Sequence, residues 1–460
     1  MTECSQPSFH FAGPRRREVV ARFDGGTISS DGGALLLGEV ERRLHILERF
    51  AGCFLDHRDP SKVEHQVGEL VSQRVLGLCL GYEDLCDHDQ LRQDPLLGLL
   101  SGKAAAGSCL AGKSTLSRLE LSRSDMAAED RYKRIALDTA AIDALLVDAF
   151  LESHAQPPAS IVIDLDATDF AIHGRQEGRF FHGFYDHYCY LPLYIFCGEH
   201  LLCARLRRSD IDASQGTLDE IPRIVEQVRA RWPEVRITLR ADSGFCREAI
   251  MAWCEGNGVE YAFGLARNER LQALVRYAEG LAAMDFAATG KPQRRFEELE
   301  YRTLDSWSRS RRVVAKVEYT AKGFNPRFVV TSLERAQIDA RPLYEELYCA
   351  RGDMENRIKE QQLGLFAERV SAQTMAANQV RLYFASVGYV LMHALRRLGL
   401  VGTELERAQC DTIRVRLLKI GARVKTSVRR VVVSLSEAFP LQELFARVLD
   451  HLRAGGLSSA

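Results

Sequence analysis

The chain changes its pattern at Pro157-Pro158, and this change limits the folds that are open to it. Before the two prolines, apolar residues recur mainly at helical spacing. After them, residues 160–170 read SIVIDLDATDF, a run rich in β-branched residues that predicts a strand. Strand-like segments then run together before they alternate with helical ones. This order predicts a mixed α/β sheet that follows a helical N-terminal part.

The expected elements follow from periodicity and turn residues. In the N-terminal part we expect helices at 63–77, 84–92, 114–123 and 130–150. After the strand at 160–170 we expect strands at 190–197, 200–207, 236–240 and 260–265, with helices at 217–231 and 245–257. Strand-like segments at 296–303, 312–319 and 327–331 indicate a β-rich insertion, and a long helical section runs from 341 to about 400.

A chain of 460 residues is too long for one compact core, so several structural units are expected. The expected division is a basic arm (1–20), a helical N-terminal domain (21–155), a first core part (156–270), a β-rich insertion (271–340), a second core part (341–400) and a basic C-terminal region (401–460). The arm ends in Arg15-Arg16-Arg17, and a solvated terminus explains it equally well.

The net charge of -1 gives no global attraction to nucleic acid, so DNA binding would need local clusters of cations. One such cluster lies between Asp411 and Ser436, where the cations are Arg414, Arg416, Lys419, Arg423, Lys425, Arg429 and Arg430. They are candidates for phosphate contacts. The cationic side of ordinary amphipathic elements is an equally good explanation.

The twelve cysteines are scattered, and no CxxC pair is present. The densest group, Cys189, Cys197, His200 and Cys203, lies among apolar strand residues, which favours buried structural cysteines over a zinc site. No apolar run approaches the ~18 residues of a membrane-spanning helix, and no signal peptide is visible. We therefore expect a cytoplasmic protein with reduced thiols and no membrane partner.

Two aspartates share one face of the strand at 160–170. Because side chains alternate along a strand, Asp164 and Asp166 point to the same side, opposite Ile163 and Leu165. Two buried carboxylates are costly unless a cation neutralises them, and Mg²⁺ prefers carboxylate oxygen. For this strand alone, a turn cap or an arginine partner is the better explanation.

A second strand repeats the arrangement, because the strand at 236–240 runs through Ala241 into Asp242, and Ser243-Gly244 then permit a tight turn. Alone, Asp242 is equally well a helix cap. Two strand-end aspartates in one α/β block make a shared metal site more plausible, since such sheets place their sites at the carboxyl ends of strands.

The third candidate segment is a polar helical stripe. Its positions are separated by three, four, four and three residues: Tyr348, Arg351, Glu355, Lys359 and Gln362. These residue types do not form a core face. The stripe is either a solvated face with pairs such as Glu355–Lys359, or a metal-binding glutamate flanked by groups that grip a phosphate backbone.

These pieces together resemble the DDE transposases of bacterial insertion sequences, and most closely the family of insertion sequence thirteen-eighty, within the broader group of insertion sequence four. The resemblance rests on VIDLDATD, RADSGF and the spacing Tyr348-x2-Arg351-x3-Glu355, and it covers most of residues 25–440. Weaker matches in the right order support it: DHDQLRQDP, TLSRLE, HGRQ, YLPL and ANQ.

The resemblance implies an RNase H-like core in which Asp166, Asp242 and Glu355 are the catalytic and metal-binding acids, with Asp164 competing for the first place. It implies two Mg²⁺ or Mn²⁺ ions that serve both DNA cleavage and strand transfer. The implied partners are terminal inverted repeats, target DNA and a second copy of the chain in the DNA complex, and the helical domain of residues 21–155 is expected to be the DNA-binding domain that recognises the repeats. We expect Tyr348, Arg351, Lys359 and Gln362 to contact DNA. The family has lysine where this chain has Gln362, which predicts weaker DNA-end binding or a substitute role for Lys359.

Three other functions compete with this interpretation. Residues 107–114 fit the P-loop pattern GxxxxGK[ST], but no strand-like segment precedes them, so we expect no nucleotide. A catalytically inactive DNA-binding protein derived from a transposase is favoured only by Gln362. A glycosidase also uses paired carboxylates, but it would leave the helix from Tyr348 to Glu355 unexplained.

Overall fold

The structure is a computed structural model that describes residues 7–13, 17–103, 109–126 and 134–454. It contains two compact units, one formed by residues 1–137 with 387–460 and the other by residues 138–386. Each unit is described by itself. Residues 15 and 16 of the predicted basic arm, and residues 107 and 108 of the P-loop pattern, lie outside the described residues.

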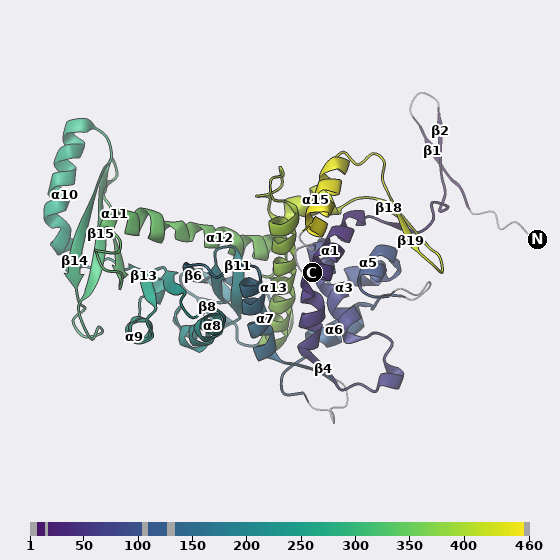
Figure 1. Cartoon of the computed structure of the whole chain (residues 1–460), viewed down its shortest axis with the longest axis horizontal. Helices are drawn as coiled ribbons and strands as arrows, with labels where there is room; N and C mark the ends of the chain where they lie inside the picture. Colours follow the sequence, from purple (N-terminus) through teal and green to yellow (C-terminus); the bar gives the residue numbers. More distant parts are fainter. Residues whose placement is uncertain (1–6, 14–16, 104–108, 127–133, 455–460) are drawn as a thin grey trace, which may run out of the picture. The chain divides into compact units, whose positions relative to one another are not determined.

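The unit of residues 138–386 is built on one large mixed sheet (Figure 1). Its strands in spatial order are β11 (His200–Arg205), β10 (Leu193–Cys197), β6 (Ser160–Ala167), β12 (Arg236–Ala241), β13 (Glu260–Leu265), β17 (Arg327–Thr331), β15 (Arg311–Thr320) and β14 (Gln293–Tyr301). Strand β16 (Gly323–Phe324) pairs with β15. Only β6, β12 and β13 run parallel to one another.

Helices cover both faces of this sheet, and the alternation of side chains along the strands explains why. Ile161, Ile163 and Leu165 of β6 belong to a buried cluster, as their alternation predicted. This cluster also takes in four helices: α7 (Thr139–Glu152), α8 (Thr217–Arg231), α9 (Glu248–Gly256) and α10 (Glu269–Thr289). In Figure 1, α8 and α9 lie on the opposite side of the sheet from the run that contains α12.

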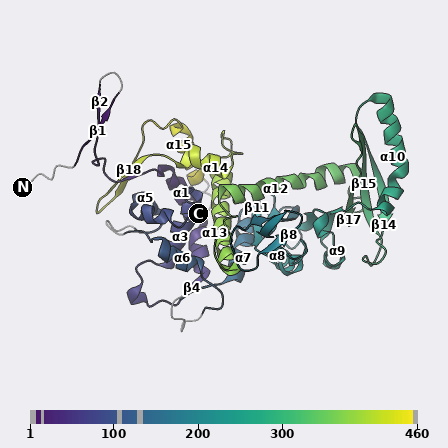
Figure 2. The same ribbon diagram turned by 180° about the vertical axis from the view of Figure 1, so that it is seen from behind.

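The strands of the predicted insertion do not form a separate body. Strand β17 pairs antiparallel with β13, so β17, β15 and β14 extend the same sheet that carries β6 and β12. The segment also contains a long helix, α10, in a region where no helix was predicted from the sequence. Figure 2 shows α10 alongside β14 and β15. Its buried residues Leu271, Val275 and Ala278 join the main core, so the segment is mixed α/β rather than β-rich.

The unit also begins earlier than the predicted boundary at residue 156. It starts at Asp138, because helix α7 places Val147, Phe150 and Leu151 in the same cluster as strand β6. Asp138 caps this helix by accepting a hydrogen bond from the amide of Ala141. The two prolines mark the turn between helix and strand and do not separate two units.

The second face of the sheet carries a helical run over residues 340–364. It consists of α11 (Ala340–Pro342), a π turn (Leu343–Tyr348), a 3-10 turn (Cys349–Arg351), α12 (Gly352–Lys359) and a further π turn (Glu360–Gly364). Leu343 and Tyr344 pack with Ala262, Val314 and Val329, which point away from the main cluster. The two π turns flank the segment that contains Glu355. Such turns are frequent at functional sites.

The unit of residues 1–137 and 387–460 is mainly helical. Its main helices are α1 (Leu35–Leu44), α2 (Ile46–Gly52), α3 (Val67–Cys79), α4 (Asp87–Gln90), α5 (Pro95–Leu100), α6 (Lys113–Glu120), α14 (Cys410–Ile413) and α15 (Gln442–Ala454). Helix α13 (Met375–Gly399) contains the division between the units. Among the described residues, no helix is long and apolar enough to cross a membrane.

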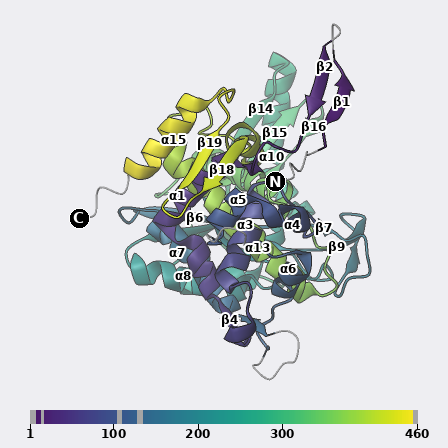
Figure 3. The same ribbon diagram turned by 90° about the vertical axis from the view of Figure 1, so that its right-hand side faces the viewer.

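Two segments for which the sequence predicted no strands contain short strands. Part of the N-terminal arm forms a hairpin of β1 (Phe9–Ala12) and β2 (Glu18–Ala21). The basic C-terminal region contains β18 (Ala422–Thr426) and β19 (Val431–Leu435), which Figure 3 shows as a two-stranded ribbon. Strand β3 (Ile28–Ser29) pairs with β18. Further short strands are β4 (Phe54–Asp56) and β5 (Ile135–Leu137).

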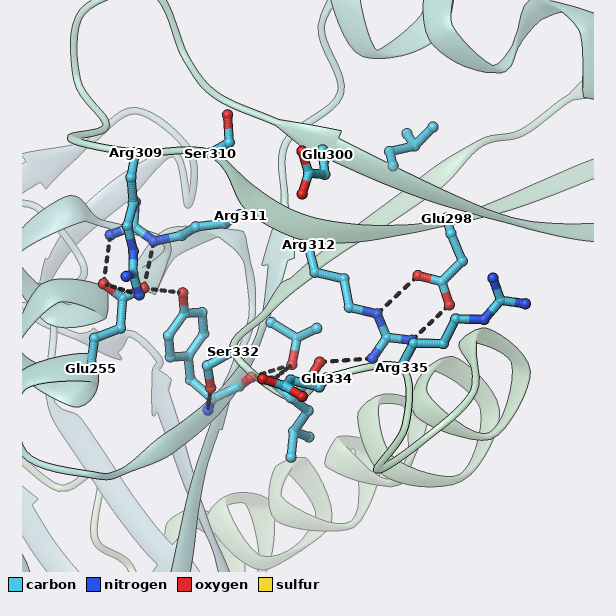
Figure 4. A pocket seen from close by; sticks show the side chains of 14 residues that line it. Glu255, Glu298, Glu300, Arg309, Ser310, Arg311, Arg312, Ser332, Glu334 and Arg335 are labelled. Atoms are coloured by element: carbon cyan, nitrogen blue, oxygen red, sulfur yellow. Dashed lines mark hydrogen bonds and ion pairs between the residues drawn. The ribbon is translucent and has the colours of Figure 1, made fainter.

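An arginine clamp holds helix α9 against strand β15. The Arg311 side chain is 2% exposed and donates to Glu255 at 2.7 Å and to Glu248 at 2.7 Å. Glu255 also accepts from the Tyr261 hydroxyl at 2.8 Å. Glu255, Tyr261 and Arg311 line a cavity of about 510 Å³ (Figure 4). None of the three candidate catalytic acids lines this cavity, and its buried arginine is satisfied by carboxylates.

This clamp predicts a dependence of stability on pH. Burial of Glu255 raises its pKa, but hydrogen bonds from Arg311, Tyr261 and Arg309 outweigh burial and lower the pKa from 4.5 to about 2. The stabilisation is therefore complete above pH 4.5 and is lost as the pH falls from 4.5 towards 2. We expect Glu255→Gln to lower the free energy of unfolding by about 2–3 kcal/mol at pH 7. Urea denaturation at pH 7 and pH 3 measures it.

The control for this prediction is Glu300→Gln, because Glu300 is exposed and lines the same cavity. It is expected to change stability little at either pH. If Glu255→Gln and wild type differed as much at pH 3 as at pH 7, the clamp would not be the source of the dependence.

Candidate active site

Asp166 and Asp242 lie side by side on adjacent parallel strands. Asp164 is opposite Arg240, and Leu165 is opposite Ala241, so the next pair in this register is Asp166 and Asp242. The backbone of Asp242 is extended (φ -74°, ψ -173°), which continues the strand by one residue. Neighbouring strands are about 4.8 Å apart. The two carboxylates therefore share one face and one edge of the sheet.

Both aspartates are also fixed by the backbone that follows them. The Asp166 carboxylate accepts a hydrogen bond from the amide of Ala167 at 2.9 Å. The Asp242 carboxylate accepts one from the amide of Gly244 at 2.8 Å and caps the short 3-10 turn Ser243–Phe245. Asp242 therefore lies at a strand end and also caps the following turn, so both predicted features are found. One oxygen of each carboxylate can satisfy the backbone while the other faces the site.

Asp164 has a different environment from Asp166. Its carboxylate receives a two-pronged hydrogen bond from Arg240, at 2.5 and 2.7 Å, and both side chains are buried. Arg240 also donates to the carbonyl of Leu347 in the helical run. Asp164 therefore has an arginine partner, which is one of the two structural roles expected for an aspartate on this strand. Of the two competing acids, the geometry favours Asp166 as the one available to a ligand.

Arg351 connects Asp166 with Glu355. Its guanidinium lies 3.6 Å from the Asp166 carboxylate and 3.0 Å from that of Glu355. Glu355 thus pairs with Arg351, one turn before it, and no Glu355–Lys359 pair is found. The Glu355 side chain is 46% exposed. Two of the three acids predicted from distant parts of the sequence therefore contact one arginine, and the third is on the neighbouring strand.

The electrostatics of Asp166 reflect this crowding. Burial raises the pKa of Asp166, Arg351 lowers it, and the negative charges of Asp242 and Glu355 raise it further, to about 7. The side chain is 15% exposed. A carboxyl group with this pKa is ionised only partly at neutral pH. Its positive partner, Arg351, is shared with Glu355.

Of the other members of the predicted stripe, two are half-buried and one is exposed. Tyr348 is half-buried, and a Cβ added at Gly264 would lie 2.5 Å from its hydroxyl, so glycine is needed for this close approach. Gln362 donates weakly to the Thr168 hydroxyl at 3.5 Å and to the Asp169 carbonyl at 3.4 Å. Lys359 is exposed. Tyr348 is thus packed near Asp242, with a half-buried side chain, and its contact with DNA stays a prediction.

The donor set fits a hard divalent cation, although it is not gathered around one point. Among the described residues, no three Asp, Glu, His or Cys side chains lie closely enough to hold an ion as they stand. The Arg351 guanidinium contacts two of the three carboxylates. A cation would replace the charge of Arg351 and relieve the repulsion that raises the pKa of Asp166. Carboxylate oxygens are the ligands that such ions prefer.

The predicted basic cluster separates into buried and exposed residues. Arg414 is buried and donates to the carbonyls of Cys79 and Leu78, which removes it from the candidate phosphate contacts. Lys419 pairs with buried Asp31 at 2.6 Å. Arg416 pairs with Glu404 at 2.8 Å. The first three cations of the cluster therefore have partners within their own unit.

The remaining cations lie on the β18–β19 ribbon. Arg423 and Lys425 are exposed on β18, where they alternate with buried Ala422 and Val424. Arg429 and Arg430 are exposed in the turn that joins the strands. Their cationic side chains extend into solvent, which both explanations of the cluster allow.

The P-loop pattern is not supported by its surroundings. The described segment in front of it is helix α5, where a buried strand would be needed. Lys113 begins helix α6 and pairs with Asp89 at 3.2 Å. The cysteines of the apolar strands are buried, as predicted: Cys189, Cys197 and Cys203.

Two residues beside the acids were not singled out in the sequence. Asp169 pairs with His187 at 2.7 Å, three residues after Asp166. Arg240 holds Asp164, and a charged residue between Leu239 and Ala241 near the end of β12 was the available signal. Without the register of β6 and β12, nothing in the sequence connected Arg240 to an acid 76 positions away.

Strand-end carboxylates facing a helix-borne glutamate define a candidate cation-binding site on a mixed α/β scaffold. Residues 11–456 match the family model described as transposase DDE domain, group 1, so the chain belongs to this family of DDE transposases. No protein with a curated description matches the sequence.

Among solved structures, the chain is similar to piggyBac transposase in a cryo-EM structure of its synaptic complex with hairpin DNA. The identity is 9%, the TM-score is 0.40, and the match covers 94% of this chain and 83% of that chain. At this TM-score we draw no argument from the likeness.

Proposed function

We propose that this protein cleaves the ends of an insertion sequence and joins them to target DNA by metal-dependent phosphoryl transfer, in a cut-and-paste reaction. The observation that carries the proposal is the register that places Asp166 beside Asp242, with Glu355 joined to Asp166 through Arg351. We further propose that β6, β10, β11, β12 and β13 with their helices are an RNase H-like core. The resemblance to the family of insertion sequence thirteen-eighty supports both statements.

In this proposal Asp166, Asp242 and Glu355 hold two Mg²⁺ or Mn²⁺ ions. Divalent ions at such a site activate the attacking oxygen and stabilise the departing one in phosphoryl transfer. The backbone amides of Ala167 and Gly244 orient the first two carboxylates. Arg351 exchanges its contacts with the acids for a contact with a DNA phosphate, a group that guanidinium binds well. Asp164 acts only through Arg240, as a positioning residue.

The partners in this proposal are the terminal repeats and target DNA, with a second copy of the chain in the DNA complex. Arg423, Lys425, Arg429 and Arg430 of the β18–β19 ribbon are the remaining candidates from the basic cluster for phosphate contacts. Cations that neutralise phosphates release counterions, so their contribution falls steeply with salt. Gln362 provides a weaker contact than the lysine of the resembling family.

The direct test is incubation of the protein with duplex DNA that carries candidate terminal repeats, with and without Mg²⁺. The proposal expects metal-dependent nicks at the repeat ends and free 3′ ends that then join to a target plasmid. DNA binding without cleavage in any divalent metal would instead support the inactive DNA-binding protein that Gln362 favours.

A second test detects the ions without DNA. Divalent ions that bind only the folded protein are expected to stabilise it by about 2–3 kcal/mol at saturation, which raises the melting temperature. Mn²⁺ titration of the wild type is expected to give this rise, and Asp242→Asn is expected to remove most of it. Asp305→Asn, at an exposed acid, is the matched control. An equal rise in wild type and Asp242→Asn would contradict metal binding at this site.

A further inference from the structure

An exposed aromatic hairpin lies next to the candidate acids. Strands β7 (Phe170–Ala171), β9 (His187–Tyr190) and β8 (Phe180–His182) form a small sheet of their own. Three of its aromatic side chains are largely exposed: Phe184 at 85%, Phe181 at 53% and Tyr188 at 44%. Exposed rings that gather in one place are typical of a surface that binds a partner or ligand.

The rings contact one another in two groups, one on each face of the β8–β9 pair. Phe181 packs edge-to-face on Tyr188 with ring centroids 5.6 Å apart. Phe184 packs on Tyr185 at 5.0 Å, and His182 lies 4.9 Å from Tyr185. Asp186 has a left-handed backbone (φ +59°), which turns the chain back into β9. The group of His182, Phe184 and Tyr185 lies on the same side as His187, whose ring is 6.2 Å from that of Tyr185.

Side-chain contacts connect this surface with the acids. His187 in β9 pairs with Asp169 at 2.7 Å, and Gln362 of the glutamate-bearing run donates to the Asp169 carbonyl at 3.4 Å. Burial and the negative charges of Asp169 and Asp166 raise the pKa of Tyr185 to about 12. Tyr185 is close enough to sense Asp166, and it stays protonated.

One arginine lies over a ring on each face of this sheet. The Arg179 guanidinium lies over the Tyr188 ring at 4.5 Å, and that of Arg208 lies over the Phe180 ring at 4.4 Å. Aromatic rings combined with cations are the usual surface for single-stranded nucleic acid, in which bases stack on rings and phosphates meet cations. A paired base cannot do this, because its faces are covered within the duplex.

We infer that the β8–β9 hairpin stacks an unpaired DNA base beside the phosphate that the acids cleave, with Phe184 as the main stacking ring. This inference rests on the proposed function, because it assigns the hairpin's ligand to the same DNA. A second copy of the chain is the competing occupant of the surface. The adjacent acid site, and Arg208 over the Phe180 ring on the same face, favour DNA.

The experiment measures binding of two DNA probes in Ca²⁺ without Mg²⁺. One probe is a blunt duplex, and the other is the same duplex with a short single-stranded extension that contains 2-aminopurine. Stacking tolerates any sequence, so the terminal repeat need not be known. We expect Phe184→Ala to bind the extended probe about 5- to 100-fold more weakly and the blunt probe unchanged. Phe184→Tyr is expected to restore binding.

The matched control is Tyr277→Ala, at a 79% exposed aromatic residue on α10. It is expected to bind both probes like the wild type. Equal weakening of both probes by Phe184→Ala, or no weakening of either, would overturn the inference. A change in sedimentation without a change in affinity would assign the surface to a second copy instead.

The outcome is separable from that of the proposed function. Binding in Ca²⁺ reports on the hairpin even if no variant cleaves DNA in Mg²⁺. Conversely, a cleaving enzyme whose 2-aminopurine signal is the same in wild type and Phe184→Ala would reject the hairpin alone.

Discussion

Asp242→Asn is expected to abolish metal-dependent cleavage of element-end DNA, with a loss of about 10³-fold or more. A ligand carboxylate accounts for several kcal/mol of transition-state stabilisation, and each 1.36 kcal/mol corresponds to about tenfold in rate. Asparagine keeps an oxygen that can accept the Gly244 amide, so the turn after β12 is preserved. The loss is therefore attributable to the charge and not to a disturbed strand end.

The measurement is single-turnover nicking of labelled repeat DNA in Mg²⁺, alongside a mobility-shift assay. DNA binding is expected to persist, because the variant removes a negative charge near the phosphate. Asp166→Asn and Glu355→Gln are expected to behave alike, while Asp305→Asn retains activity. Full activity of Asp242→Asn would refute the assignment of the three acids.

Asp164→Ala is expected to destabilise the unit of residues 138–386 by about 3–5 kcal/mol, since it leaves Arg240 buried without its charge partner. Arg240 is 8% exposed and Asp164 is 3% exposed, so water cannot replace the lost contact. The double variant Asp164→Leu with Arg240→Met is expected to lose less than Asp164→Ala, because it removes both charges. Urea denaturation compares the three proteins.

A cleavage assay of Asp164→Asn and Asp166→Asn decides between the two competing aspartates. If Asp164 acts through Arg240, Asp164→Asn keeps part of the hydrogen bonding to Arg240. Its cleavage rate per folded molecule is then far higher than that of Asp166→Asn. If Asp164 were the metal-binding acid, the order of activities would be reversed. The folded fraction is measured for each variant under the conditions of the cleavage assay.

Local periodicity determined the elements that form the sheet. The predicted bounds of α8, β13 and β17 agree with those observed, because each segment carries its own pattern and turn residues. The alternation that sends Ile163 and Leu165 to the core was also readable. The same alternation placed Asp164 and Asp166 together on the other face. Alternation alone could not distinguish the environments of Asp164 and Asp166, since both residues point to the same face of the strand.

Tertiary structure decided what depends on contacts between distant segments. The pairing of β17 with β13 turned an expected insertion into part of one sheet, and the register of β12 on β6 gave Arg240 to Asp164 and placed Asp242 beside Asp166. Burial removed Arg414 from the candidate DNA contacts. Strand register and burial are set by packing across the whole unit, so the sequence alone named the acids while only the fold showed which of them stand together.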